Sequence, residues 1–286
     1  MKVKADWAKR AWKDAISNSD NIASDIHTSI RDIESQLINP TEIELGTYIV
    51  DCGFLSVNTS RCAIVKFNNK ETADAWLLLA ESFVYALTGF KIAFAIKIPN
   101  GTPRDLNRGS LLFCSALALK CRPVAEWTAR FILDVEANPK SKLRPQEPDD
   151  FQCLAYLFAA EVTGSTIKRQ WREQLDAGLY GPLLRAETLA EAQAALPELA
   201  IARGALVLES FMAYPPFEWP PYDLFPIDIL AILLMRHTDM AEFDFGCLES
   251  PLCHPPAVLN WEKNDLIRRV EARVQSLYEY SHVDWE

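Results

Sequence analysis

The chain has 286 residues, of which 49% are hydrophobic and 24% charged, a balance typical of a soluble globular protein and not of a disordered one. Its 39 acidic and 29 basic residues give a net charge of −10. This excess of acid argues against binding to nucleic acid, which requires clustered lysine and arginine, and against binding to anionic membranes.

Helical periodicity dominates the N-terminal third of the sequence. It predicts one or two amphipathic helices over residues 7–37, whereas the next segment is less helical and we expect a small β-hairpin within 47–67. A further helix is predicted over 72–88, ended by Gly89. The longest apolar stretch, 76–98, is interrupted by charged residues, so we interpret it as buried core and not as a membrane span.

The middle of the chain carries clear start signals for helices. An apolar helix is predicted over 107–121, and Pro123 fits the first turn of the next helix, where a missing N–H costs nothing. Residues 139–148 are rich in proline and lysine and form the best candidate linker. Asp149 and Asp150 follow at a helix start, where the helix dipole favours carboxylates.

The rest of the chain is predicted to be helical as well, with helices over 165–176, 182–194, 197–213, 228–238 and 261–280. We therefore expect an all-α protein, an irregular multi-helix bundle. It forms a single helical domain over 1–286, which the linker 139–148 divides into parts 1–138 and 149–286.

Most of the net negative charge lies in one segment, 205–250, where eight carboxylates face a single basic residue, Arg236. The same segment contains the loop YPPFEWPPYDLFP at 214–226, in which prolines alternate with aromatic and acidic residues. Stiff backbone, aromatic side chains and carboxylates without a local counter-ion are suited to binding a basic protein. The residues expected to face this partner are Glu218, Trp219, Tyr222, Asp223, Glu242, Asp244 and Glu249.

Two alternatives for this segment remain open. Loop aromatics such as Phe217, Trp219 and Tyr222 are often buried, and the loop would then be core packing. Against this, a loop of this length inside a helical domain is more often functional than a simple connection. If the loop is core packing, the interface is expected elsewhere, around Glu147, Asp149 and Asp150.

The sequence shows no pattern typical of catalysis or of cofactor binding. It lacks a nucleophile elbow, a phosphate-binding glycine loop and a dinucleotide fingerprint. Four potential metal ligands lie near one another, but not in the tight pairs that zinc sites use: His237, Cys247, Cys253 and His254. We therefore expect no catalytic residues, no metal and no cofactor.

Cysteine usage and the N-terminus both bear on the compartment. The chain has seven cysteines, an odd number, without a C-x-x-C pair, which is typical of reduced cytosolic thiols. The first residues include lysines but no apolar run behind them, so no signal peptide is expected. Both observations favour a cytoplasmic protein.

The C-terminal half resembles a known family. The stretch FPIDILAILL at 225–234, the acidic Glu242-Phe-Asp244 and the turn ESPLCHP at 249–255 are similar to the all-α immunity proteins of bacterial polymorphic toxin systems, in particular the immunity protein 49 family. The resemblance covers about 110–259. It implies a cytoplasmic antitoxin without catalysis that binds and occludes one cognate toxin domain, often a nuclease. Such domains are basic, which agrees with an acidic partner.

Two other classes compete with this interpretation. A helical scaffold or adaptor would have the same composition, but would bind a segment and not a folded domain. A helical hydrolase that reverses a toxin's modification would need clustered acids at a metal.

Overall fold

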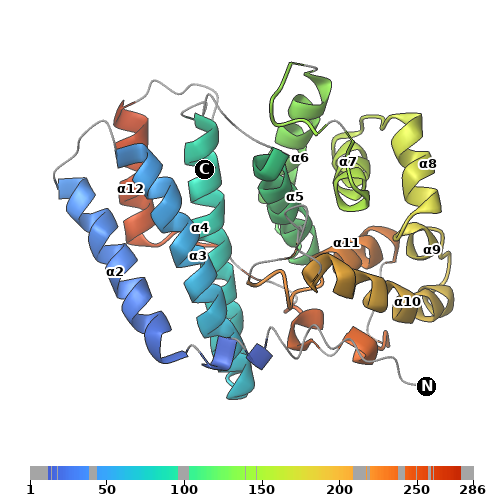
Figure 1. Ribbon diagram of the computed structural model, residues 1–286, viewed down its shortest axis with the longest axis horizontal. Coiled ribbons are helices and arrows are strands. Elements are labelled where there is room, and N and C mark those ends of the chain that lie inside the picture. The colour runs from blue at the N-terminus through green and yellow to red at the C-terminus, as the bar shows by residue number, and fades with distance from the viewer. Residues whose placement is uncertain are drawn as a thin grey trace. The chain divides into compact units, whose positions relative to one another are not determined.

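The structure is a computed structural model in which 77% of the residues are helical. It describes residues 12–13, 15–17, 19–38, 44–95, 103–138, 140–145, 147–208, 217, 220–237, 242–248, 250–256, 259 and 261–277. No strand occurs within these ranges, and the prediction of an all-α fold is confirmed (Figure 1).

The chain folds into two compact units. Unit 1 comprises Met1–Ala11 and Thr102–Val258, and unit 2 comprises Trp12–Gly101 and Leu259–Glu286. This division differs from the expected one. The proline- and lysine-rich segment 139–148 lies inside unit 1, because the helices on either side of it pack directly against each other.

Unit 2 contains four described helices: α2 (Ser19–Ile38), α3 (Glu44–Asn68), α4 (Thr72–Ala95) and α12 (Asp265–Leu277). α3 packs against α2 and α4, and α12 packs against the same two helices. The arrangement places the apolar sides of all four around a common core.

The prediction of a β-hairpin within 47–67 is wrong, since α3 covers this whole segment. Its buried residues Tyr48, Cys52, Leu55, Thr59 and Ala63 follow helical spacing. Polar side chains among the buried residues interrupt the helical pattern of hydrophobic residues, so the helix is not apparent from the sequence. They fit the core because their hydroxyls bond within the helix, as where Oγ of the fully buried Ser60 donates to the Ser56 carbonyl at 2.8 Å.

α4 begins at Thr72, as predicted, but continues through Gly89, so the predicted break there is wrong. A Cβ on Gly89 would lie 3.1 Å from Cβ of Cys52 on α3. The glycine therefore permits close helix packing instead of ending the helix. Among the described helices, α4 alone is long and apolar enough to cross a membrane by length and composition, and 67% of its apolar window is buried within the protein.

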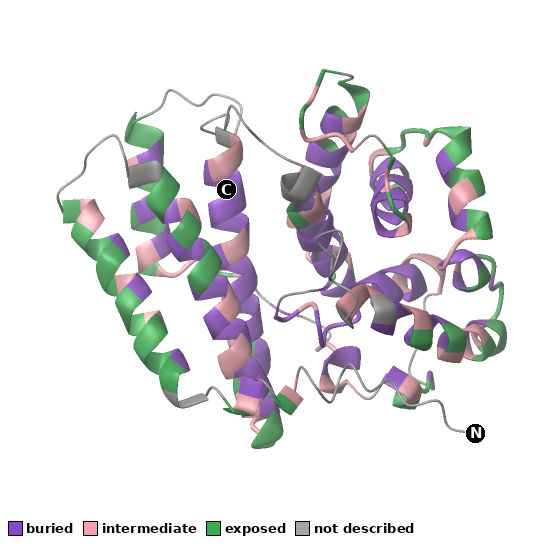
Figure 2. Ribbon diagram, viewed as in Figure 1, coloured by how far each residue is buried: buried purple, intermediate pink, exposed green. Residues whose placement is uncertain are grey.

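Unit 1 begins with three longer helices: α5 (Pro103–Ala118), α6 (Arg122–Ala137) and α7 (Asp150–Thr163). Pro123 lies in the first turn of α6, which confirms that prediction. Asp149 caps α7: its side chain accepts from the Gln152 backbone, and the Gln152 side chain accepts from the Asp149 backbone in return. α7 is buried over most of its length and forms the centre of the unit (Figure 2).

The second half of unit 1 contains α8 (Arg169–Ala177), α9 (Gly181–Leu184), α10 (Leu189–Leu208) and α11 (Ile227–Arg236). Two short 3-10 turns follow, η1 (Gly246–Leu248) and η2 (Pro251–Cys253). The predicted separation of helices 182–194 and 197–213 is wrong, because α10 runs through both ends of this gap and contains Pro197. α10 contacts α9 and η1, and α11 packs against α5.

Candidate functional site

The described part of the proline-aromatic loop folds inward. Phe217 is fully buried and meets Phe151 of α7 edge-on, with ring centroids 4.9 Å apart. On the same ring lies the guanidinium of Arg203, whose Cζ is 4.4 Å from the centroid. This part of the loop is therefore core packing, stabilised by a cation over an aromatic face.

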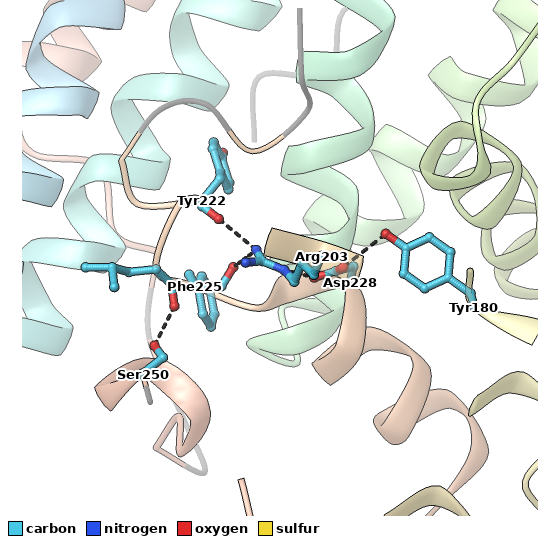
Figure 3. Close-up of polar contacts among 7 residues, drawn as sticks. Tyr180, Arg203, Tyr222, Phe225, Asp228 and Ser250 are labelled. Atoms are coloured by element: carbon cyan, nitrogen blue, oxygen red, sulfur yellow. Dashed lines mark hydrogen bonds and ion pairs between the residues drawn. The ribbon is translucent and has the colours of Figure 1, made fainter. Parts of the chain in front are cut away.

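Arg203 of α10 holds the following residues of the loop by their backbone. Its Nη2 donates to the carbonyl oxygens of Tyr222 at 2.7 Å and of Phe225 at 3.0 Å (Figure 3). Its Nε donates to Oδ1 of Asp228, the second residue of α11, at 2.9 Å. One guanidinium thus joins two helices and the chain between them, using the fork geometry that distinguishes arginine from lysine.

Two hydroxyl groups extend this connection. Tyr180, next to α9, donates to Oδ2 of Asp228 at 3.0 Å, and burial raises the pKa of this phenol well above its ordinary value. Ser250, before η2, donates to the carbonyl of Leu224 (Figure 3). The described loop residues 222–225 are consequently held from α10 and from the start of η2, and the residue next to α9 holds α11.

The structure separates the seven residues expected to face a partner. Asp223 is buried, with 8% of its surface exposed, and Tyr222 is half-buried with its hydroxyl bonded to Ser115 of α5. Burial raises the pKa of that phenol. Glu242 and Asp244 are exposed. The remaining three, Glu218, Trp219 and Glu249, lie outside the described residues.

The segment 205–250 exposes fewer negative charges at the surface than its composition suggests. Asp228 is one of its eight carboxylates, but this side chain is 0% exposed and is paired with Arg203. Arg203 stands just before the segment, so a count within 205–250 misses this neutralisation. Together with the buried Asp223, Asp228 contributes no exposed charge.

The two exposed acids are held beside α10. The side-chain amide of Gln193 donates to the Asp244 carbonyl at 2.7 Å and accepts from the Asp244 N–H at 2.8 Å. Oδ1 of Asp244 also accepts from the Gly246 N–H at 2.7 Å. These bonds fix the backbone of the 242–248 segment against the second turn of the helix.

α10 itself carries exposed acids. Within the described residues from 186 to 256, every exposed charged side chain is acidic; these are Glu187, Glu191, Glu198, Glu242 and Asp244. The two arginines of the same stretch do not oppose them: Arg203 is buried, and Arg236 pairs with Glu161 at 2.8 Å. Sequence reasoning missed Glu187, Glu191 and Glu198, because they precede the segment in which acids were counted.

Glu191 has a structural role in addition to its charge. Its carboxylate accepts from the backbone N–H groups of Glu187 at 2.8 Å and of Thr188 at 3.2 Å, and Thr188 Oγ1 accepts from the Glu191 N–H at 3.2 Å. This is a capping box at the start of α10. The backbone hydrogen bonds lower the pKa of Glu191 below its ordinary value.

Two of the three acids of the alternative interface around 147–150 make hydrogen bonds within unit 1. Asp149 is the cap of α7, and Asp150 accepts from the Leu179 N–H at 2.8 Å and from the Gln174 side chain at 3.2 Å. Glu147 is exposed. Both aspartates thus serve the junction between α7 and α8.

Two of the four potential metal ligands have other surroundings in the fold. Cys253 is buried, which raises the pKa of its thiol to about 12, and His254 lies edge-on against Phe245 at 5.1 Å. Among the described residues, no group of three or more His, Cys, Asp and Glu side chains comes together in a way that could hold a metal ion.

Comparison of the chain with family models, curated proteins and solved structures finds no match.

Proposed function

We propose that this protein binds a basic protein domain and blocks it, as the resemblance to immunity proteins of toxin systems implies. The observation that carries the proposal is the segregation of charge on unit 1. The exposed charges described between 186 and 256 are all acidic, and they come from two segments that Gln193 holds together.

Charge of one sign on a surface has a direct effect on association. It accelerates the encounter with a partner of opposite charge and disfavours partners of like charge. Enzymes that cleave nucleic acid need basic surfaces to hold phosphates. A nuclease toxin is therefore the class of partner that an acidic inhibitor of this kind fits best.

The way in which the acids are held supports the same function. Residues 242–248 contact α10 through paired backbone bonds to Gln193, and Arg203 and Asp228 fix the underlying loop from the core. A surface that is already ordered loses less entropy on binding than a flexible one. Tight inhibition of a toxin benefits from this preorganisation.

Action by binding and not by catalysis is part of the proposal. One group of buried polar side chains in unit 1 consists of Tyr180, Arg203 and Asp228, the kind of cluster that elsewhere marks an active site. All three are 0% exposed, and they hold the loop and one another. They are thus placed to stabilise the fold and are not reachable by a substrate.

A cytoplasmic location belongs to the proposal as well, because a nuclease toxin is dangerous where nucleic acid is accessible. All seven cysteines are free thiols, and four of them are buried. This usage fits a reducing compartment.

The test is co-expression with the product of the neighbouring gene. We expect that product to stop growth when expressed alone, to be harmless beside this chain, and to co-elute with it as a stable complex. Charge reversal by Glu198→Lys with Glu242→Lys should slow association and weaken its dependence on salt. Asp25→Lys with Asp74→Lys, at exposed acids of unit 2, is the matched control and should leave the rate nearly unchanged.

The proposal fails if the neighbouring product is harmless and does not bind. It also fails if both pairs of charge reversals slow association equally, since net charge alone would then be responsible.

A further inference from the structure

α10 has two sides of different character. Its inner side is buried and carries Ala192, Leu196, Leu199 and Arg203. Its outer side carries four apolar residues that are exposed or half-buried: Ala190 and Ala194 are exposed, Pro197 is half-buried, and Ile201 is 51% exposed. These four residues are called the α10 seam below.

The α10 seam is continuous along the helix. Its members follow one another at i, i+4, i+7 and i+11, so at 3.6 residues per turn they lie within an arc of roughly 60° and extend over about 17 Å. A helix that faces only water is normally polar on that side. An apolar line of three turns is therefore an unpartnered face.

Acids flank this line on both sides. Glu191 and Glu198 follow its members by one residue and lie together on one flank, because they are seven residues apart. Gln193 lies on the other flank, where its side chain holds the backbone of the exposed Asp244. The result is an apolar strip with Glu191 and Glu198 on one flank and Asp244 on the other; the described residues 186–256 include no exposed lysine or arginine, and the exposed Arg185 immediately precedes them.

Pro197 adds a hydrogen-bond acceptor to the strip. Proline has no N–H, so residue 197 cannot donate to the carbonyl of Gln193 four residues earlier, as a helix requires elsewhere. That carbonyl oxygen can accept a hydrogen bond from a partner's lysine or arginine. This backbone carbonyl thus favours a basic side chain of the partner, as the carboxylates do.

From this arrangement we infer that the α10 seam docks a basic amphipathic helix of the partner. Apolar side chains at i, i+4, i+7 and i+11 of such a helix match the seam, and lysine or arginine beside them meets Glu191, Glu198 and Asp244. The small side chains of Ala190 and Ala194 allow the two helices to approach closely. A second copy of this chain fits poorly, because its own acids would face these borders.

The inference deepens the proposed function and rests on it in taking the partner to be a protein. Charge complementarity selects the occupant, and the exposed Ile201 supplies the apolar contact that slows dissociation. Charges at the border of an interface act mainly on association, whereas a buried apolar anchor acts on dissociation.

The experiment uses a synthetic peptide, so it does not depend on knowing the toxin. The probe is a labelled peptide of about five helical turns, made of alanine, leucine and lysine, with leucines spaced as the seam and lysines beside them. A peptide of identical composition with scrambled order has the same charge but no apolar stripe. We expect the full chain to bind the first peptide at least about tenfold more tightly than the second.

Two variants locate the binding. Ile201→Asp should weaken binding of the striped peptide by about tenfold or more, since it places a charge in the apolar line. Ala194→Lys should weaken it as well, through repulsion of the lysines. Leu77→Asp, at a residue of α4 that is 64% exposed, is the control and should have no effect. Circular dichroism of each variant establishes that it is folded.

Equal binding of the two peptides, or unchanged binding after both Ile201→Asp and Ala194→Lys, would overturn the inference. The outcomes separate it from the proposed function. Binding of the striped peptide at the seam without any binding of the neighbouring gene product leaves the seam intact and refutes the antitoxin. A bound toxin that is indifferent to both variants refutes the seam alone.

Discussion

The carboxylate of Asp228 accepts a hydrogen bond from Nε of Arg203 at 2.9 Å, and both side chains are 0% exposed. Two charges removed from water in this way are stable only as a pair with further hydrogen bonds around them. Here the carbonyls of Tyr222 and Phe225 and the hydroxyl of Tyr180 provide those bonds. The pair therefore holds the described residues 222–225 in place just before α11.

Removing one partner of this pair should be strongly destabilising. Arg203→Met leaves the Asp228 charge buried without its cation, and we expect a loss of about 3–5 kcal/mol in the free energy of unfolding. Urea denaturation measures it. The double variant Arg203→Met with Asp228→Leu should recover part of this loss, because no buried charge remains. A double variant less stable than Arg203→Met would contradict this account.

Tyr180→Phe tests the hydroxyl end of the same group. It removes one neutral donor to a charged acceptor and should cost about 1–3 kcal/mol, less than Arg203→Met. The same urea experiment gives the comparison. A negligible loss would contradict this, since Tyr180→Phe keeps the ring and the ring packing, and not the hydroxyl, would then be what matters.

Helix starts could be predicted from the sequence because their signals are local. Asp149 and Pro123 each act within one turn of their own position, and both lie where the sequence places them. α3 could not be predicted in the same way. Its inner side includes the buried Thr59 and Ser60, and the hydroxyl of Ser60 is satisfied within the helix, so burial and hydrophobicity do not coincide along the chain.

For the candidate site, the sequence predicted only that its charge is negative. Glu242 and Asp244 are exposed as expected, but Asp223 and Asp228 are buried, and the cation that pairs with Asp228 stands outside the segment that was counted. Composition sums charges along the chain, whereas the surface depends on which charges meet in the fold. The acids of α10 lie outside the counted segment. Only the hydrogen bond between Gln193 and Asp244 in the structure shows that they lie beside Asp244.

The capping box of α10 gives a prediction for pH. Backbone hydrogen bonds lower the pKa of Glu191 in the folded state, so its contribution to stability is present above the pKa of the unfolded chain. That contribution is lost as the pH falls through the folded-state pKa. Glu191→Gln should therefore lower the melting temperature at neutral pH, and the difference from the wild type should shrink in acid. A difference that stays constant with pH would contradict this.

Glu271 of α12 should show the opposite dependence. Burial raises its pKa, although Nζ of Lys263 lies 2.8 Å from Oε2 and favours the ionised form. The folded protein thus keeps the proton to higher pH than the unfolded chain does. Its contribution to stability is complete below the unfolded pKa and is lost as the pH rises through the folded value. Glu271→Gln should flatten the stability profile in this window, as unfolding measured at several pH values would show; an unchanged slope would refute it.

Two glycines of unit 2 provide a matched pair for testing the packing of α3 on α4. A Cβ at Gly53 of α3 meets nothing within 4 Å, so Gly53→Ala should stabilise the protein by about 0.5–1 kcal/mol through lower entropy of the unfolded chain. A Cβ at Gly89 of α4 would lie 3.1 Å from Cβ of Cys52 and 3.4 Å from the carbonyl oxygen of Ile49. Gly89→Ala should therefore be less stable than Gly53→Ala by about 1 kcal/mol or more, because α3 must move to admit the methyl group. Equal stability of the two variants in urea denaturation would show that the helices are not in close contact at this position.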